Sequence, residues 1–191
     1  MPSIALDSNC FTYLIDGLHE KPPTQDELGS EKAALVKLFF YRPNDIEFYL
    51  SPTVINEYKK IKNYNELENH HSWCNIHFLE FFEWQNDNGG IIQIIEREVE
   101  SKAKELHTKT FSNKKNNHHL NDCKIVVECD KYNIDNLLSY DTDMLKINDN
   151  SEVNIQTPSK FLSNFDLKKS NLKYTPREDN PLYRNQWWLG N

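Results

Sequence analysis

Apolar residues occur along this chain in two alternating patterns. Short unbroken apolar runs have the length of buried strands, and longer stretches repeat their apolar residues at helical spacing, as Leu35, Leu38 and Phe39 do. The strands that we predict are residues 4–7, 46–50, 91–95, 136–140 and 153–156. Strands that alternate with helices favour an α/β fold with a central parallel sheet and helices on both faces.

The helices that we predict lie between these strands. Ser51 and Pro52 mark one helix start, because serine is a common N-cap and proline suits the first helical position. Asn121 and Asp122 are expected to open another helix. The remaining helices are predicted at residues 9–17, 27–41, 70–84, 96–107 and 158–165.

Four acidic residues stand at comparable places in this pattern. Asp7 ends the first strand and Asp141 ends a later one. Glu57 lies in the second turn of the helix that follows Ser51, and Asp122 is placed at a helix start. Right-handed crossovers bring the carboxyl ends of parallel strands to one edge of the sheet, where the active site of such folds lies.

Carboxylates gathered at one point repel each other unless a cation compensates them. Their hard oxygen atoms suit Mg²⁺ or Mn²⁺, and such ions promote phosphodiester hydrolysis. Each acid also has an ordinary structural interpretation. Asp7 could cap a helix, Glu57 could be solvated, Asp122 could interact with a helix dipole, and Asp141 could be a turn residue.

Five segments, in order, resemble the PIN-domain nucleases, which include the VapC-type toxins. They are LDSNCFTYLID, SPTVINEY, LNDCKIVVEC, SYDTDML and VNIQTPSKFL, and they span roughly residues 4–162. The resemblance implies a Rossmann-like three-layer α/β/α sandwich and a metal-dependent ribonuclease that cleaves RNA. For the VapC-like members it also suggests an antitoxin partner and a homodimer.

The resemblance assigns roles to individual residues. It implies a catalytic, metal-binding set of Asp7, Glu57, Asp122 and Asp141. Asp143 stands where some members carry a further acid, and Ser8 and Asn9 are expected to support the metal site.

A basic stretch leads into Asp122 and is the predicted RNA-binding segment. The residues predicted to bind RNA are Lys109, Lys114, Lys115, His118 and His119. Lysines there could hold phosphates, and histidines could stack on bases or donate hydrogen bonds. A solvated loop is the alternative interpretation.

The composition argues against two classes of protein, those that coat nucleic acid and those that span a membrane. A net charge of -7 argues against a protein that coats nucleic acid over its whole surface, although a local basic rim remains compatible with it. We see no leader and no apolar run long enough for a membrane span, and we expect a cytoplasmic protein with reduced cysteines.

The 191 residues fit one nuclease domain over residues 1–165, with an aromatic-rich helical insertion at about 63–101 and a C-terminal extension over 166–191. His70, Cys74 and His77 could share a helix face as zinc ligands, but a half-buried aromatic helix is favoured.

Two functional alternatives stay open. One is RNA processing or structure-specific cleavage on the same fold, and the other is a non-catalytic nucleic-acid-binding or scaffold protein.

Overall fold

The computed structural model describes residues 3–19, 25–40, 46–60, 91–93, 98–112 and 117–165. Most of the insertion predicted at 63–101 and all of the extension 166–191 lie outside these ranges. The zinc alternative at His70, Cys74 and His77 lies outside them as well, as do Lys114 and Lys115.

A five-stranded parallel sheet forms the centre of the described fold, in the order β3-β2-β1-β4-β5. This confirms the predicted α/β class with a central parallel sheet. The strands are β1 (Ser3–Leu6), β2 (Glu47–Leu50), β3 (Ile91–Gln93), β4 (Asn136–Leu138) and β5 (Asn154–Gln156).

The central strand β1 is buried because its apolar residues face helices on both sides of the sheet. Ile4, Ala5 and Leu6 are each fully buried, as expected for a parallel strand that is covered on both faces. Ile4 pairs with Phe48 of β2 on one side and with Asn136 of β4 on the other. The sequence run that ends at Asp7 therefore runs through the middle of the sheet.

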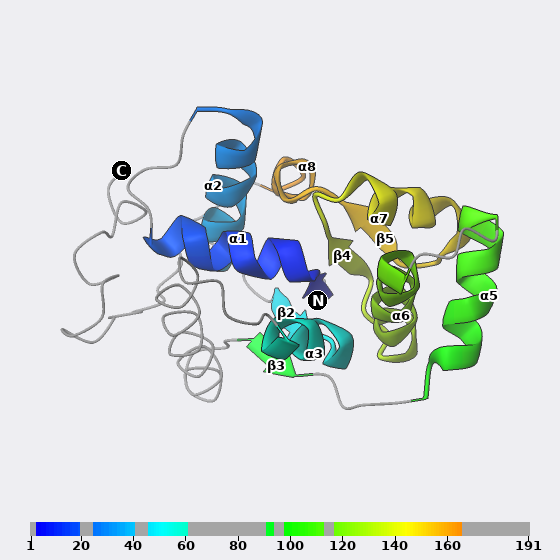
Figure 1. Ribbon diagram of the computed structural model, residues 1–191. Helices are drawn as coiled ribbons and strands as arrows, with labels where there is room; N and C mark the ends of the chain where they lie inside the picture. Colours follow the sequence, from blue (N-terminus) through cyan, green and yellow to red (C-terminus); the bar gives the residue numbers. More distant parts are fainter. Residues whose placement is uncertain are drawn as a thin grey trace.

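Helices cover both faces of this sheet, which gives the described part three layers (Figure 1). On one side α1, α2 and α8 pack together, and on the other side α6 packs against α3 and α5. The helices are α1 (Ser8–His19), α2 (Glu27–Phe40), α3 (Pro52–Lys60), α5 (Glu100–Phe111), α6 (Asn117–Lys131), α7 (Thr142–Lys146) and α8 (Pro158–Leu162), with a 3₁₀ turn η1 (Ile147–Asn150) after α7.

The strand order places a topological switch point between β1 and β4. From β1 the chain moves outward through β2 to β3, and then returns to the other side of β1 to form β4 and β5. In doubly wound sheets the crevice beyond the carboxyl ends of the strands at such a point is the usual binding site. Asp7 and Asp141 follow the two strands that border it.

Some element boundaries differ from those predicted. Helix α6 begins at Asn117, four residues before the predicted start at Asn121, so Asp122 lies in its second turn and the prediction that it opens the helix was wrong. The polar run before Leu120 has no apolar periodicity that could mark this start. Helix α5 likewise runs over Glu100–Phe111 rather than 96–107, and α8 ends at Leu162.

The described part of the chain contains no helix long and apolar enough to cross a membrane. Three of the four cysteines, Cys10, Cys123 and Cys129, are described, and all three are buried without a disulfide. They pack as small apolar residues within the core.

Candidate active site

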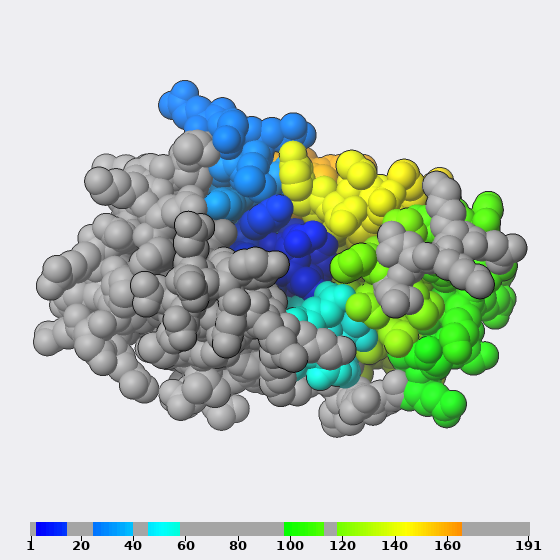
Figure 2. Space-filling view, viewed as in Figure 1, coloured from blue at the N-terminus to red at the C-terminus, as the bar shows by residue number. Residues whose placement is uncertain are grey.

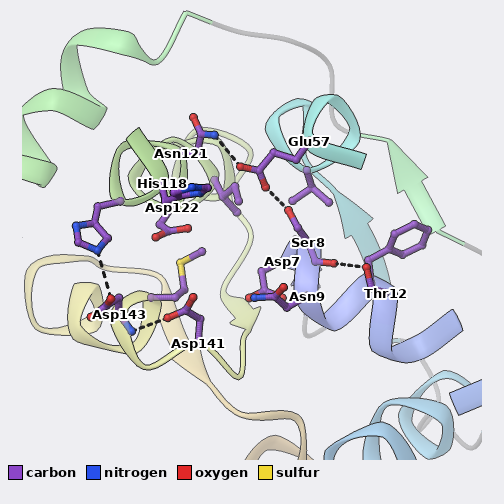
Figure 3. A pocket seen from close by; sticks show the side chains of 15 residues that line it. Asp7, Ser8, Asn9, Thr12, Glu57, His118, Asn121, Asp122, Asp141 and Asp143 are labelled. Atoms are coloured by element: carbon purple, nitrogen blue, oxygen red, sulfur yellow. Dashed lines mark hydrogen bonds and ion pairs between the residues drawn. The ribbon is translucent and has the colours of Figure 1, made fainter. Parts of the chain in front are cut away.

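A cavity of about 540 Å³ opens at the carboxyl ends of β1 and β4. Figure 2 shows the dark blue N-terminal residues on this face, bounded by cyan residues of α3 and by green and yellow residues of α6 and α7. The side chains come from the end of β1, from α1, α3 and α6, and from α7 with the residue before it (Figure 3). The lining residues are Asp7, Ser8, Asn9, Phe11, Thr12, Val54, Glu57, His118, His119, Asn121, Asp122, Ile125, Asp141, Asp143 and Met144.

All of the predicted acidic residues line this one cavity. Asp7, Glu57, Asp122, Asp141 and Asp143 come from positions spread over most of the described chain, and the fold brings them together. Ser8 and Asn9, the predicted supporting residues, line it as well.

Asp7 is buried where β1 gives way to α1, with only 2% of its surface exposed. Its Oδ1 accepts a hydrogen bond from the backbone N–H of Cys10, which makes it the N-cap of α1. Its Oδ2 accepts a bond from the hydroxyl of Ser139. Burial raises the pKa of Asp7 to about 6, against the opposing effect of these two donors. The residue therefore caps a helix and also faces the cavity.

Glu57 is held at both of its carboxylate oxygens. The hydroxyl of Ser8 on α1 donates to Oε2, and the side-chain amide of Asn121 on α6 donates to Oε1 at 2.7 Å. Both contacts are visible as dashed lines in Figure 3. Glu57 thus lies where three helices meet, and its orientation is set by neutral donors from two of them.

Among the described carboxylates of the site, Asp122 has the pKa that is raised furthest above its ordinary value. Burial raises its pKa to about 7, and the negative charges of Asp141, Glu57, Asp7 and Asp143 act in the same direction. Four other acids therefore lie close enough to Asp122 to disfavour its ionisation. These effects agree with the shared cavity in placing the carboxylates in one site.

Asp141 and Asp143 occupy the start of α7. Asp141 is the N-cap of that helix, because its side chain accepts the backbone N–H of Asp143 at 2.7 Å. Asp143 itself contacts two basic side chains, Lys146 and His119, and the hydrogen bond from Lys146 is the main cause of its lowered pKa. Asp143 is therefore already paired with the positive charge of Lys146, and none of the other acids of the cavity has such an ion pair among the described residues.

Of the described residues predicted to bind RNA, the two histidines line the cavity and the lysine does not. His118 and His119 line the cavity. The ring of His119 stacks on Phe111 with centroids 4.2 Å apart, and its Nε2 lies 3.2 Å from Oδ2 of Asp143. Lys109 pairs with Glu105 one turn away on α5 and is not among the described lining residues.

Two contacts at this site were not predicted. Ser139 is fully buried and binds Asp7, and Asn121 binds Glu57. A small polar residue directly after the apolar pair Leu137 and Leu138 is the sequence signal that could have indicated Ser139. The partner of Asn121 lies on a different helix, so no local pattern identifies it.

No group of three or more His, Cys, Asp or Glu side chains that could hold a metal ion is found among the described residues. The carboxylates share a cavity but do not converge on one point as they stand. Any cation there would have to draw them closer together.

No family model matches this chain, and neither does any curated protein. Among solved structures, the chain is similar to one described as FitAB bound to an IR36 DNA fragment. The identity is 16%, the TM-score is 0.49, and the match covers 82% of this chain and 95% of that one.

Proposed function

We propose that this protein is a metal-dependent endoribonuclease that uses Mg²⁺ or Mn²⁺. The observation that carries the proposal is that Asp7, Glu57, Asp122 and Asp141, which come from separate elements, line one cavity at the switch point of the sheet. The raised pKa of Asp122 supports it. Burial is the main cause of that shift, and the repulsion from the neighbouring carboxylates that adds to it is what a cation would relieve.

The donor set fits such an ion in its chemistry. The four acids offer only oxygen atoms, which are the ligands preferred by Mg²⁺ and Mn²⁺. Such an ion, when bound, activates a water molecule and offsets negative charge on the scissile phosphate. Asp7, Glu57, Asp122 and Asp141 would hold it.

The other residues of the cavity have supporting parts in the proposed reaction. The backbone N–H of Cys10 and the hydroxyl of Ser139 keep the Asp7 carboxylate turned toward the cavity. His118, which is exposed and lines the cavity, would contact the RNA backbone. The buried apolar residues Val54 and Ile125 form part of the cavity wall.

The resemblance to VapC-type toxins extends the proposal to a toxin–antitoxin or related defence function. In that case expression of the protein should arrest growth, and Asp7→Asn should abolish the arrest. Equal arrest by both proteins would count against the toxin function. An antitoxin partner and a homodimer belong to this same proposal.

Cleavage of a mixed set of structured and single-stranded RNAs by the purified protein tests the nuclease. The reactions contain Mn²⁺, Mg²⁺ or EDTA, with matching DNA substrates to separate RNA from DNA preference. Asp7→Asn and Asp141→Asn should lose metal-dependent cleavage. Asp130→Asn, which removes an exposed acid at the far end of α6, should retain it. RNA binding without cleavage in any metal would instead favour a non-catalytic binding protein.

A further inference from the structure

Two side-chain bridges join α3 to α6, one at each end of their contact. At one end the amide of Asn121 donates to Oε1 of Glu57 at 2.7 Å. At the other end Glu128 accepts two hydrogen bonds from Thr53, one from its hydroxyl at 2.7 Å and one from its backbone N–H at 3.3 Å. The first bridge reaches the cavity, and the second lies outside its lining, which includes neither Glu128 nor Thr53.

The spacing of these residues lets both bridges act between the same two helix faces. Asn121 and Glu128 are seven residues apart on α6, which is about two turns. Thr53 and Glu57 are four residues apart on α3, which is about one turn. The early residue of α6 pairs with the later residue of α3, so the two helices run in opposite directions along this contact.

Glu128 does more than complete a helix cap. The first turn of α3 already has a local cap, since the Ser51 hydroxyl accepts the backbone N–H of Val54. Glu128 adds an acceptor from another helix, and it is buried with 6% of its surface exposed. A buried carboxylate is costly unless it is hydrogen-bonded, so its bonds to Thr53 fix the position of α3 relative to α6.

We propose that Asn121 and Glu128 are positioning residues that hold Glu57 in the orientation in which it binds the metal ion. This inference rests on the proposed function, in which Glu57 is a ligand. Glu128 sets the place of α3, and Asn121 sets the rotation of the Glu57 carboxylate. A carboxylate oxygen has two lone pairs, so Oε1 can accept the Asn121 amide and still bind a cation. Hydrogen-bonded partners of this kind orient metal ligands.

Binding of Mn²⁺ alone to the full chain, measured by electron paramagnetic resonance, tests the inference without relying on catalysis. Asn121→Ala should weaken Mn²⁺ binding by about 10-fold or more, the effect typical of residues that orient a ligand. Glu128→Ala should act in the same direction. Glu128→Gln keeps one acceptor for Thr53 and should restore part of the affinity. Asn150→Ala, which removes an exposed amide that bonds Thr110, is the matched control and should bind as the wild type does.

A double-mutant comparison separates positioning from a general loss of structure. If Asn121 acts through Glu57, adding Asn121→Ala to Glu57→Gln should weaken Mn²⁺ binding by less than twofold more. In RNA cleavage the single Asn121→Ala variant should lower kcat and leave KM within about twofold. If Glu128→Ala does not fold, the Mn²⁺ affinity of Asn121→Ala, alone and combined with Glu57→Gln, still tests the inference.

The outcomes for the two proposals are distinct. If wild-type protein binds Mn²⁺ and Asp122→Asn does not, while Asn121→Ala and Glu128→Ala bind as tightly as wild type, the positioning inference is overturned alone. Independent, fully additive effects of Asn121→Ala and Glu57→Gln would overturn it as well. If wild-type protein and Asp122→Asn bind Mn²⁺ equally weakly, the proposed metal site itself fails, and the positioning inference fails with it.

Discussion

The hydroxyl of Ser139, at the end of β4, donates a hydrogen bond to Oδ2 of Asp7, at the end of β1. Both residues are buried, so the Asp7 carboxylate depends on this donor in place of water. We expect Ser139→Ala to lower the free energy of unfolding by about 1–3 kcal/mol at pH 8. Urea unfolding in the presence of EDTA measures the change.

A matched serine tests whether the loss is specific to Asp7. Ser163 is exposed, and its hydroxyl donates to the backbone carbonyl of Lys160, so Ser163→Ala should change stability by under about 0.5 kcal/mol. In an Asp7→Asn background the cost of Ser139→Ala should shrink, because the charged acceptor is gone. An undiminished cost there would show that Ser139 stabilises the fold without acting on Asp7.

The carboxylates of Asp7 and Asp122 should make the metal-free protein less stable as the pH rises. Their folded-state pKa values are raised from 3.8 to about 6 and about 7. The contribution of these two groups to stability is fully present below about pH 4 and is lost as the pH rises through 6 and 7. The total is on the order of a few kcal/mol. Thermal unfolding in EDTA at pH 5 and pH 8 should show the decline.

The difference between two proteins isolates this effect from other titrations. A variant with Asp7→Asn and Asp122→Asn should lose less stability between pH 5 and pH 8 than the wild type does. Mg²⁺ at pH 8 should raise the unfolding temperature of the wild type but not of the variant. The same pH slope in both proteins would contradict the assignment of the raised pKa values to these carboxylates.

The sequence pattern was sufficient to predict the sheet and its acidic edge. Asp7 and Asp141 could be placed because each follows a short apolar run, and parallel strands end at one edge. The start of α3 could be placed because Ser51 and Pro52 are a local signal for a helix start. The Ser51 hydroxyl accepts one of the backbone N–H groups that have no partner within the helix. In each case the signal that allows the prediction is local in the sequence.

Contacts between distant parts of the chain could not be predicted in this way. Asn121 meets Glu57 only because α3 and α6 pack on the same side of the sheet, and hydrophobic spacing does not specify which helices become neighbours. The start of α6 was missed for a different reason. Its first turn begins with polar residues, including His118 and His119, where apolar residues would mark a helix. Leu120 is the first apolar residue of the helix to pack against the core, and Cys123 is the first that is fully buried.

Two aromatic rings pack against each other in the core between α2 and β2. Phe39 of α2 and Phe48 of β2 pack edge to face with centroids 5.5 Å apart, and both are almost fully buried. Phe48→Ala should lower the free energy of unfolding by about 3–5 kcal/mol, through lost apolar burial and the cavity left behind. Phe165→Ala removes a ring that is only partly buried and should cost clearly less. Equal losses from the two substitutions, measured by chemical denaturation, would contradict this placement of the core.

Asp143 should matter less to metal binding than Asp141, although both line the cavity. The carboxylate of Asp143 contacts His119 and Lys146, so its charge is already compensated. Asp141 has no such ion pair among the described residues, and asparagine can replace it as the N-cap of α7 without loss of the helix. We expect Asp143→Asn to weaken Mn²⁺ binding by less than 10-fold and Asp141→Asn by considerably more.

Lys146→Ala serves as the control, because freeing Asp143 from its partner should leave the affinity for Mn²⁺ unchanged or slightly higher. A loss from Asp143→Asn as large as that from Asp141→Asn would make Asp143 a ligand in its own right.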